Sequence, residues 1–187
     1  VNAVDEDSQF TYRKIKDNSE IELTGYIGNS NTVNIPGTIE NLDVSSIGEG
    51  AFENKTAIES VKFTSKVTNI DKNAFKGCAS LKTLTKMNEV ASIGESAFEG
   101  CSSLESFVFP SNVTEVSSRV FYGCSSLSSI EVHRNIETIG RDPFSGTKWY
   151  NGQPDGILTA GKIAFSYKGD ITDIEIPLDI EKINNYA

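Results

Sequence analysis

Three thiols are the most reactive side chains in this sequence, and their spacing is regular. Cys78, Cys101 and Cys124 follow one another at intervals of 23 residues. A zinc site would need cysteines a few residues apart or combined with histidines, and the sequence contains one histidine. An odd cysteine count is also unsuited to a secreted disulfide scaffold. The spacing therefore predicts a column of buried free thiols that act as small apolar side chains, without a metal site or a cofactor.

The remaining candidates for catalysis also favour a protein without an active site. His133 has no serine or cysteine nucleophile placed beside it by any motif, so we expect a surface histidine. Carboxylates could serve a polysaccharide-active enzyme if several of them gathered on one surface. Instead, acidic and basic residues alternate at positions 23 apart, as on a mixed, soluble surface. These positions are Glu49, Lys72, Glu95, Ser118 and Arg141, and Glu53, Lys76, Glu99, Tyr122 and Ser145.

The interval of 23 residues extends beyond the cysteines. Phe52, Phe75, Phe98, Phe121 and Phe144 also follow one another at this spacing. Periods of about 20 to 29 residues with regular apolar positions are typical of leucine-rich solenoids. Each unit of such a protein buries its side chains against its neighbours, so stability accumulates along the array. The sequence therefore predicts an α/β solenoid with 23-residue units and an interior ladder of phenylalanines.

Each unit is expected to contain three short segments. The residues Leu104-x-x-Phe107-x-Phe109 alternate at their end as in a β-strand. Strands of this kind, stacked about 4.8 Å apart, form a parallel sheet. The pattern Val90-x-x-Ile93-Gly predicts a second extended segment that ends in a turn. The Ala-Phe-x-x-Cys segment has helical spacing and predicts one or two turns of α- or 3₁₀-helix.

The regular units do not fill the whole chain, although we expect one solenoid domain. Before them, the alternation in "FTYRKIKDNSEIELTGYIG" predicts an N-terminal β-hairpin cap, because solenoid ends need covering. After them, strands at 157–158 and 163–167 predict a hairpin insertion. The expected segments are the cap (1–34), the repeats (35–146), the insertion (147–170) and a further, truncated repeat (171–187).

Two departures from the pattern carry expectations of their own. Lys86 stands where other units have Phe63 or Phe109, so we expect that strand to end early. Residues 180–187 match 90–97 position by position, and in earlier units the next residue is the core phenylalanine. We therefore expect a fragment of a longer repeat protein. An open last coil exposes apolar interior to water, so end-to-end self-association is a further expectation.

The combined pattern Ile-Gly-x-x-Ala-Phe-x-Gly-Cys-x-x-Leu-x-x-Val/Ile-x-Phe/Val-Pro resembles the BspA-like leucine-rich repeat family. The resemblance covers the chain from about Ile35 onward, and several columns agree over five consecutive units. It implies a right-handed solenoid with a parallel β-sheet on its concave face. It also implies a secreted or cell-surface bacterial protein linked to adhesion to host matrix, host cells or other bacteria.

The exposed positions of the expected sheet are the candidate binding residues. They are short, mixed polar groups on a rigid surface, which suits extended protein or glycan recognition. A plain solvated face on a structural stalk suits them equally. The candidate concave binding face comprises Glu59, Lys62, Lys82, Thr85, Glu105, Val108, Ser128, Glu131 and His133.

Composition restricts the partners. The chain has 17 Lys and Arg against 26 Asp and Glu, a net charge of −9, which argues against nucleic acid or an anionic membrane. No apolar run is long enough to span a bilayer. We therefore hypothesise a non-enzymatic extracellular or cell-surface module that binds a host or bacterial surface protein or glycan. The alternatives are a structural spacer that presents another domain and, less favoured, a polysaccharide-active enzyme.

Overall fold

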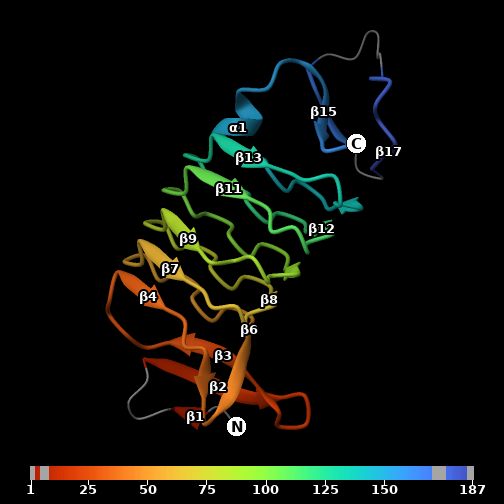
Figure 1. Ribbon diagram of the computed structural model, residues 1–187. Helices are drawn as coiled ribbons and strands as arrows, with labels where there is room; N and C mark the ends of the chain where they lie inside the picture. The colour runs from red at the N-terminus through yellow and green to blue at the C-terminus, as the bar shows by residue number, and fades with distance from the viewer. Residues whose placement is uncertain (1–2, 5–8, 170–175, 185–187) are drawn as a thin grey trace.

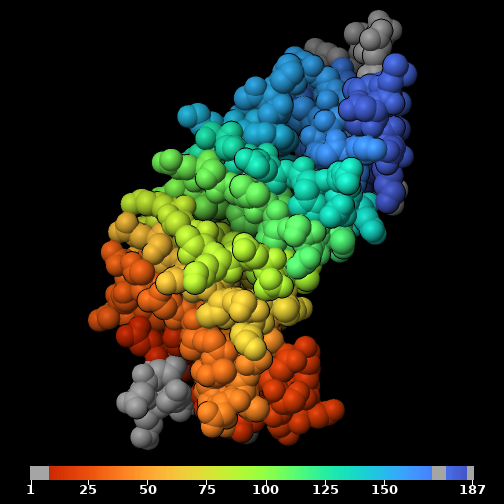
Figure 2. Space-filling model, in the orientation of Figure 1, coloured from red at the N-terminus to blue at the C-terminus, as the bar shows by residue number. Residues whose placement is uncertain are grey.

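The chain winds into a stack of coils, each of which contributes two short strands (Figure 1). The computed structural model describes residues 3–4, 9–169 and 176–184. Figure 2 shows the coils as successive colour bands along an elongated body. The first column of strands is β4 (Thr32–Asn34), β7 (Ser60–Lys62), β9 (Thr83–Thr85), β11 (Ser106–Val108) and β13 (Ser129–Glu131). The second is β6 (Leu42–Ile47), β8 (Asn69–Ile70), β10 (Ser92–Ile93), β12 (Glu115–Val116) and β14 (Thr138–Ile139).

Parallel pairing joins the strands within each column. Ser60 pairs with Thr83, and Ser106 with Ser129, so these paired residues are 23 positions apart, whereas Thr32 of β4 pairs with Ser60 of β7 across a longer interval. The first column forms two separate sheets, β4-β7-β9 and β11-β13. The second column divides at the same level, with β6-β8-β10 in one sheet and β12-β14 in another. The chain is thus a β-solenoid of parallel strands.

Lys86 does not shorten its strand. β9 has three residues, as do β7 and β11, so the expectation that this strand ends early is wrong. The register of β9 is set by β7, with which it pairs along its full length. Lys86 itself lies after β9, exposed and with a left-handed φ of 62°.

The phenylalanine ladder is confirmed. Phe52, Phe75, Phe98, Phe121 and Phe144 are fully buried. From each ring to the next, the centroids lie 4.8, 5.4, 5.6 and 6.4 Å apart, with planes within 13° of parallel. One ring per coil therefore fills the interior and contacts the rings of the coils above and below.

The three thiols are buried, as the sequence predicts, and they also form hydrogen bonds. The Sγ atoms of Cys78, Cys101 and Cys124 each donate to the carbonyl oxygen of the ladder phenylalanine in the preceding coil. The S···O distances are 3.1, 3.2 and 3.0 Å respectively. Each thiol is thus a second donor to a buried carbonyl that also accepts the backbone N–H three residues later in its own turn.

The Ala-Phe-x-x-Cys segments form successive turns, so the expected short helices are absent from them. The backbone N–H of Cys101 donates to the carbonyl of Phe98, three residues earlier, and neighbouring bonds repeat this span. Left-handed residues lie just before each segment and within it, such as Ser96 (φ 56°) before it and Gly100 (φ 74°) inside it. Such residues interrupt a right-handed helix after a single turn. The helix α1 (Lys148–Asn151) begins instead at Thr147, whose hydroxyl accepts from the N–H of Tyr150.

Both ends of the stack contain antiparallel hairpins. Near the N-terminus, β2 (Phe10–Ile15) pairs with β3 (Glu20–Tyr26), and β3 pairs in parallel with β6. The rings of Phe10 and Tyr26 lie 6.3 and 5.6 Å from that of Phe52, so this hairpin covers the first rung of the ladder. The two remaining N-terminal strands are β1 (Ala3–Val4), which pairs with β2, and β5 (Thr38–Ile39), which pairs with β6.

At the other end, β15 (Gly156–Ala160) and β16 (Ile163–Lys168) form the antiparallel pair expected from the sequence. Phe165 packs 5.5 Å from Phe144, and β16 pairs in parallel with β17 (Lys182–Ile183). The hairpin therefore belongs to the solenoid core and does not project from it. The expectation that the array continues depends on the chain end, and residues 185–187 lie outside the described residues. No helix in the described part of the chain could cross a membrane.

Replacing Phe98 with alanine should destabilise the protein by about 3–5 kcal/mol, because it leaves a cavity between two stacked rings. Urea unfolding followed by circular dichroism measures this cost. Val108→Ala is the control, since Val108 is 61% exposed, and its effect should be below about 1 kcal/mol. Equal losses in the two variants would contradict the ladder.

The three cysteines should react slowly with a thiol reagent in the native protein. Burial raises the pKa of Cys78 and of Cys124 to about 12, so little thiolate forms at neutral pH. Labelling at pH 8, in native buffer and in 6 M guanidinium, should be fast only after unfolding. Fast native labelling of all three thiols would show that the coil phasing is wrong.

Candidate functional site

Most of the sequence-predicted binding residues lie on one exposed strand surface. Lys62, Thr85, Val108 and Glu131 end β7, β9, β11 and β13, and their side chains are exposed, whereas the middle residues of these strands point inward. Lys82, Glu105 and Ser128 stand one position before their strands and are also exposed. The strand face, as we call the exposed residues at and just before β7, β9, β11 and β13, thus brings together side chains from four coils.

Two of the predicted residues are half-buried and engaged with neighbours. Glu59 bonds Lys82 at 3.0 Å across the coils, and this hydrogen bond is the main cause that lowers its pKa. His133 places Nε2 2.8 Å from the carbonyl oxygen of Pro110, and its Nδ1 accepts from the N–H of Asn135. Nδ1 is therefore unprotonated, and Nε2 donates to the carbonyl. These contacts make His133 a tie between coils rather than a free surface group.

A groove crosses the C-terminal ends of the strands next to this face. It consists of two adjoining hollows of about 680 and 440 Å³ that share Lys86 and Asn88. The larger is lined by Lys62, Phe63 and Lys86, among others, and the smaller by residues on either side of the junction between β9 and β11. We call the two hollows together the Lys86 groove. Sequence reasoning missed it, although the signal was present: Lys86 interrupts a column of large apolar residues.

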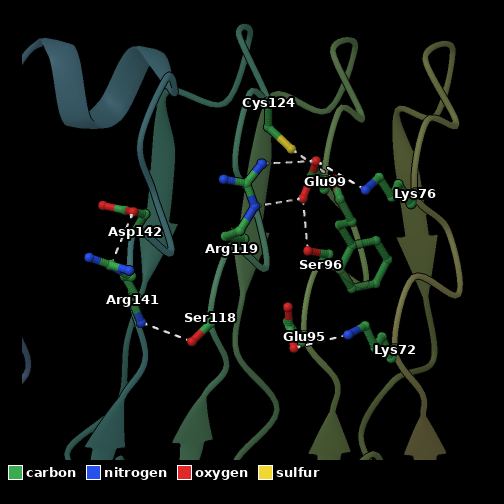
Figure 3. A network of polar contacts seen from close by, with 11 residues as sticks. Lys72, Lys76, Glu95, Ser96, Glu99, Ser118, Arg119, Cys124, Arg141 and Asp142 are labelled. Carbon is green, nitrogen blue, oxygen red and sulfur yellow. Dashed lines mark hydrogen bonds and ion pairs between the residues drawn. The ribbon is translucent and has the colours of Figure 1, made fainter.

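The turns that contain the ladder phenylalanines lie above one another along the stack, and we call this side of the coils the turn side. It carries a network of ion pairs (Figure 3). Glu99 accepts two hydrogen bonds from the guanidinium of Arg119, both of 3.1 Å, and one of 2.7 Å from the hydroxyl of Ser96. Lys76 lies 3.2 Å away in the preceding coil. The guanidinium carbon of Arg119 also lies 3.7 Å from the ring centre of Tyr122.

The partners of Glu99 decide its ionisation. Burial is the largest single influence and favours the neutral acid. The hydrogen bonds from Arg119, Ser96 and Lys76 together outweigh burial and lower the pKa of Glu99 to about 2. Glu99 is therefore ionised at neutral pH and acts as a structural anion that ties three coils together.

The alternating columns form pairs across the coils. Lys72 lies 3.2 Å from Glu95. Outside these columns, Lys66 lies 2.9 Å from Asp43, 23 positions earlier in the sequence. Each of these two carboxylates thus lies beside a lysine of a neighbouring coil. Among the described residues, no three His, Cys, Asp or Glu side chains gather where they could hold a metal ion.

Two carboxylates near the N-terminal end have raised pKa values. Burial is the largest cause for both Glu22 and Asp71, and the negative charge of Asp71 adds to the effect on Glu22. Arg13 lies 2.7 Å from Glu22, and Ser46 donates to Asp71 at 3.5 Å. Neither hollow of the Lys86 groove reaches these residues. Their contacts are those of a polar packing site.

Comparison with known proteins identifies the repeat. A family model described as "BspA type Leucine rich repeat region" matches the chain in 6 copies, over residues 26–151 and 153–187. The crystal structure of a leucine-rich repeat protein from T. pallidum is 29% identical, with a TM-score of 0.71, over 73% of this chain and 64% of the other. A search of curated proteins finds no match.

Two further solved structures share the fold. A leucine-rich repeat protein from Bacteroides ovatus is 25% identical, with a TM-score of 0.63, over 96% of this chain and 55% of the other. A leucine-rich cell surface protein from Faecalibacterium prausnitzii is 24% identical, with a TM-score of 0.67, over 100% of this chain and 51% of the other. The chain spans less than two thirds of the length of each of these proteins.

Replacing Glu99 with glutamine should cost about 2 kcal/mol of stability at pH 7, because charge-assisted hydrogen bonds are lost. The folded pKa of Glu99 is below the ordinary value of 4.5, so its contribution is present above pH 4.5 and is lost as the pH falls toward 2. Urea unfolding of both proteins between pH 7 and pH 2 should show their difference shrinking over that interval. Glu95→Gln, which removes a half-exposed pair, should cost only about 0–1 kcal/mol. A difference between wild type and Glu99→Gln that does not change with pH would contradict this role.

Proposed function

We propose that this chain, which belongs to the BspA-type leucine-rich repeat family, is a non-enzymatic protein-binding module that acts through its strand face. The observation that carries the proposal is the row of exposed side chains that end four successive strands: Lys62, Thr85, Val108 and Glu131. Glycans remain alternative ligands for the same surface.

The rigidity of the scaffold supports this function. The middle residues of β7 and β11, Val61 and Phe107, are buried and hold the strand backbone against the core. The side chains on either side of them therefore project from a fixed framework. A partner that binds such a surface orders few protein segments, so little of its binding energy is lost to conformational entropy. In the architecture that we propose for this chain, the strand face is the concave side of a right-handed solenoid of 23-residue units. The β2–β3 hairpin caps this solenoid.

The mixed chemistry of the strand face suits a protein partner. Lys62 and Glu131 place opposite charges near its two ends, and the apolar Val108, which is 61% exposed, lies between them. Polar and charged groups around an exposed apolar residue are typical of protein interfaces. An enzyme would instead need unlike reactive groups that converge, and the strand face offers none among its described residues.

We place the protein at the bacterial cell surface or outside the cell. This location draws on the family and on one protein of the same fold, which is described as a cell surface protein. A structural spacer that presents another domain is the second candidate function, and the rigid stack of coils is what favours it.

Reversing the charges at the ends of the strand face tests binding against the spacer function. The intact protein is first screened against matrix proteins, mucins and cell-wall glycans. The double variant Lys62→Glu, Glu131→Lys should then weaken binding to the identified partner at least about tenfold, which is about 1.4 kcal/mol. Its net charge is unchanged, so a general electrostatic effect is avoided.

The matched control is Lys148→Glu, Glu115→Lys, which reverses one lysine of α1 and one glutamate of β12. Both residues are exposed and lie off the strand face. This variant should bind as the wild type does. If both double variants retain full binding, or if the screen yields no partner, the spacer function is favoured.

A further inference from the structure

The two columns of strands are interrupted at one level of the stack. β9 pairs with β7 and β11 with β13, but no ladder joins β9 to β11. In the second column, β10 and β12 are likewise in different sheets. The coils before and after this junction contain the same number of residues, since Leu84 and Phe107 are 23 positions apart. The interruption therefore does not come from an insertion or a deletion.

The hydrogen bonds on either side of the junction show what it lacks. The N–H of Lys82 donates to the carbonyl of Glu59 at 2.8 Å, and the N–H of Ser128 to that of Glu105 at 2.9 Å. The equivalent bond at the junction would run from Glu105 to the carbonyl of Lys82. It is not formed among the described residues.

At the C-terminal ends of the same strands, the hydrogen bond across the junction is missing as well. The N–H of Phe63 donates to the carbonyl of Thr85 at 2.9 Å, and that of Phe109 to the carbonyl of Glu131 at 3.1 Å. The equivalent bond, from Lys86 to Val108, is missing from the described structure. β9 and β11 thus face one another with unused backbone donors and acceptors, which is the condition of a sheet edge.

The turn side remains closed at the same level. The N–H of Phe98 donates to the carbonyl of Val120 at 3.0 Å, and that of Gly100 to the carbonyl of Tyr122 at 2.9 Å. Arg119 also bonds Glu99 between these two coils. The coils are therefore joined on the turn side and unpaired between β9 and β11, as in a wedge. Beyond the strand ends, the side-chain amide of Asn112 donates to the carbonyl of Asn88 at 3.4 Å and links the two coils.

Lys86 explains why the wedge opens here. A lysine cannot take the buried place of Phe63 or Phe109 without desolvating its charge. Its φ of 62° turns the chain that follows it out of the extended geometry, so that chain does not continue in the direction of β9. The following strand carries Phe107, whose ring packs against both Phe98 and Phe121.

The wedge is the smaller hollow of the Lys86 groove. Its walls include Leu84 and Met87 from one coil and Phe107, Val108 and Phe109 from the next, in a volume of about 440 Å³. The walls also include the polar residues Lys86, Asn88, Ser106 and Ser111. Mixed walls with open backbone groups suit an extended peptide, since main-chain hydrogen bonds supply affinity and the side chains of the peptide contact the walls.

The charge of the groove indicates which peptide fits. Lys62 and Lys86 line the larger hollow, and no ion pair or side-chain hydrogen bond engages either of them among the described residues. By contrast, Lys66, Lys72 and Lys82 each pair with a carboxylate of a neighbouring coil. One carboxylate, that of Glu89, also lines the hollow. Two free cations against one anion leave a positive site in a chain whose net charge is −9.

We propose that the Lys86 groove binds an extended, acidic peptide segment of a partner protein. The peptide backbone pairs with the open edges of β9 and β11, and one of its carboxylates lies between Lys62 and Lys86. This inference rests on the proposed function, because it assigns a peptide class to one part of the same binding surface.

The test uses the purified protein and a fluorescent, soluble peptide of alternating glutamate and valine. Anisotropy titration should show binding that weakens as salt is raised. Lys86→Gln should weaken it about tenfold, and Lys86→Phe, which restores the apolar column and closes the wedge, should abolish it. Lys148→Gln, which removes an exposed lysine outside the groove, should bind as the wild type does. Thermal unfolding checks that every variant is folded.

Three further probes identify what the groove recognises. A peptide with lysine in place of glutamate should not bind, and neither should the acidic peptide with alternate amides N-methylated, which keeps its charge but cannot pair. The third probe is a sulfated glycan. The proposal is overturned if Lys86→Phe binds normally, if N-methylation has no effect, or if only the glycan binds.

The outcome can be separated from that of the proposed function. Loss of partner binding in the Lys62→Glu, Glu131→Lys variant without any peptide binding would refute the groove and keep the strand face. Suppose instead that peptide binding depends on both Lys86 and Lys62, and that the partner binds the single variant Glu131→Lys as it binds the wild type. That result would keep the groove and refute the wider strand face.

Discussion

The burial of each coil against its two neighbours is the constraint on which this structure depends. No coil has an interior of its own: the ring of Phe98 is covered by those of Phe75 and Phe121, at 5.4 and 5.6 Å. The thiol of Cys124 donates to the carbonyl of Phe98, so the same coil boundary is joined by apolar contact and by a polar bond. In such a one-dimensional stack, the strength of each boundary determines how far the structure extends. This explains why aromatic residues from both end hairpins join the ladder.

The backbone hydrogen bonds between successive coils differ between the two sides of the stack. Turns with left-handed residues form the side where backbone hydrogen bonds run without interruption, including across the junction between Phe98 and Val120. The strand side bonds continuously only within groups of coils. A wedge on one side of a closed stack gives a protein a local opening without loss of the core. The opening at Lys86 lies beside the exposed strand residues, so both binding proposals concern one continuous surface.

Electrostatics divides the basic residues into two groups. Most lysines of the repeats stand one coil away from a carboxylate, and such pairs add a cross-coil contact at each boundary, as Lys72 does with Glu95. Exposed pairs of this kind contribute little singly, but Glu99, held by Arg119, Ser96 and Lys76, is a stronger anchor because it is mostly buried. Lys62 and Lys86 differ in that, within the described part of the chain, no such pair balances their charges. Charge unbalanced within the fold is available to a partner.

The sequence by itself determined the period, the phenylalanine ladder and the burial of the thiols. These features follow from side-chain type repeated at a fixed interval, and Phe75, Phe98 and Cys101 alone would have indicated them. Most of the exposed strand residues could also be predicted, because strand alternation decides which side of Val61 or Phe107 faces solvent. Only the tertiary structure decided that the segment around Phe98, despite its helical spacing, forms turns and that β16 joins the core. It also decided that the strand pairing is interrupted between β9 and β11, next to Lys86. The physical reason is that these outcomes depend on backbone dihedral angles, such as the left-handed φ of Lys86, and on hydrogen bonds between coils. Residue periodicity specifies which side chains are buried, but it does not specify those bonds.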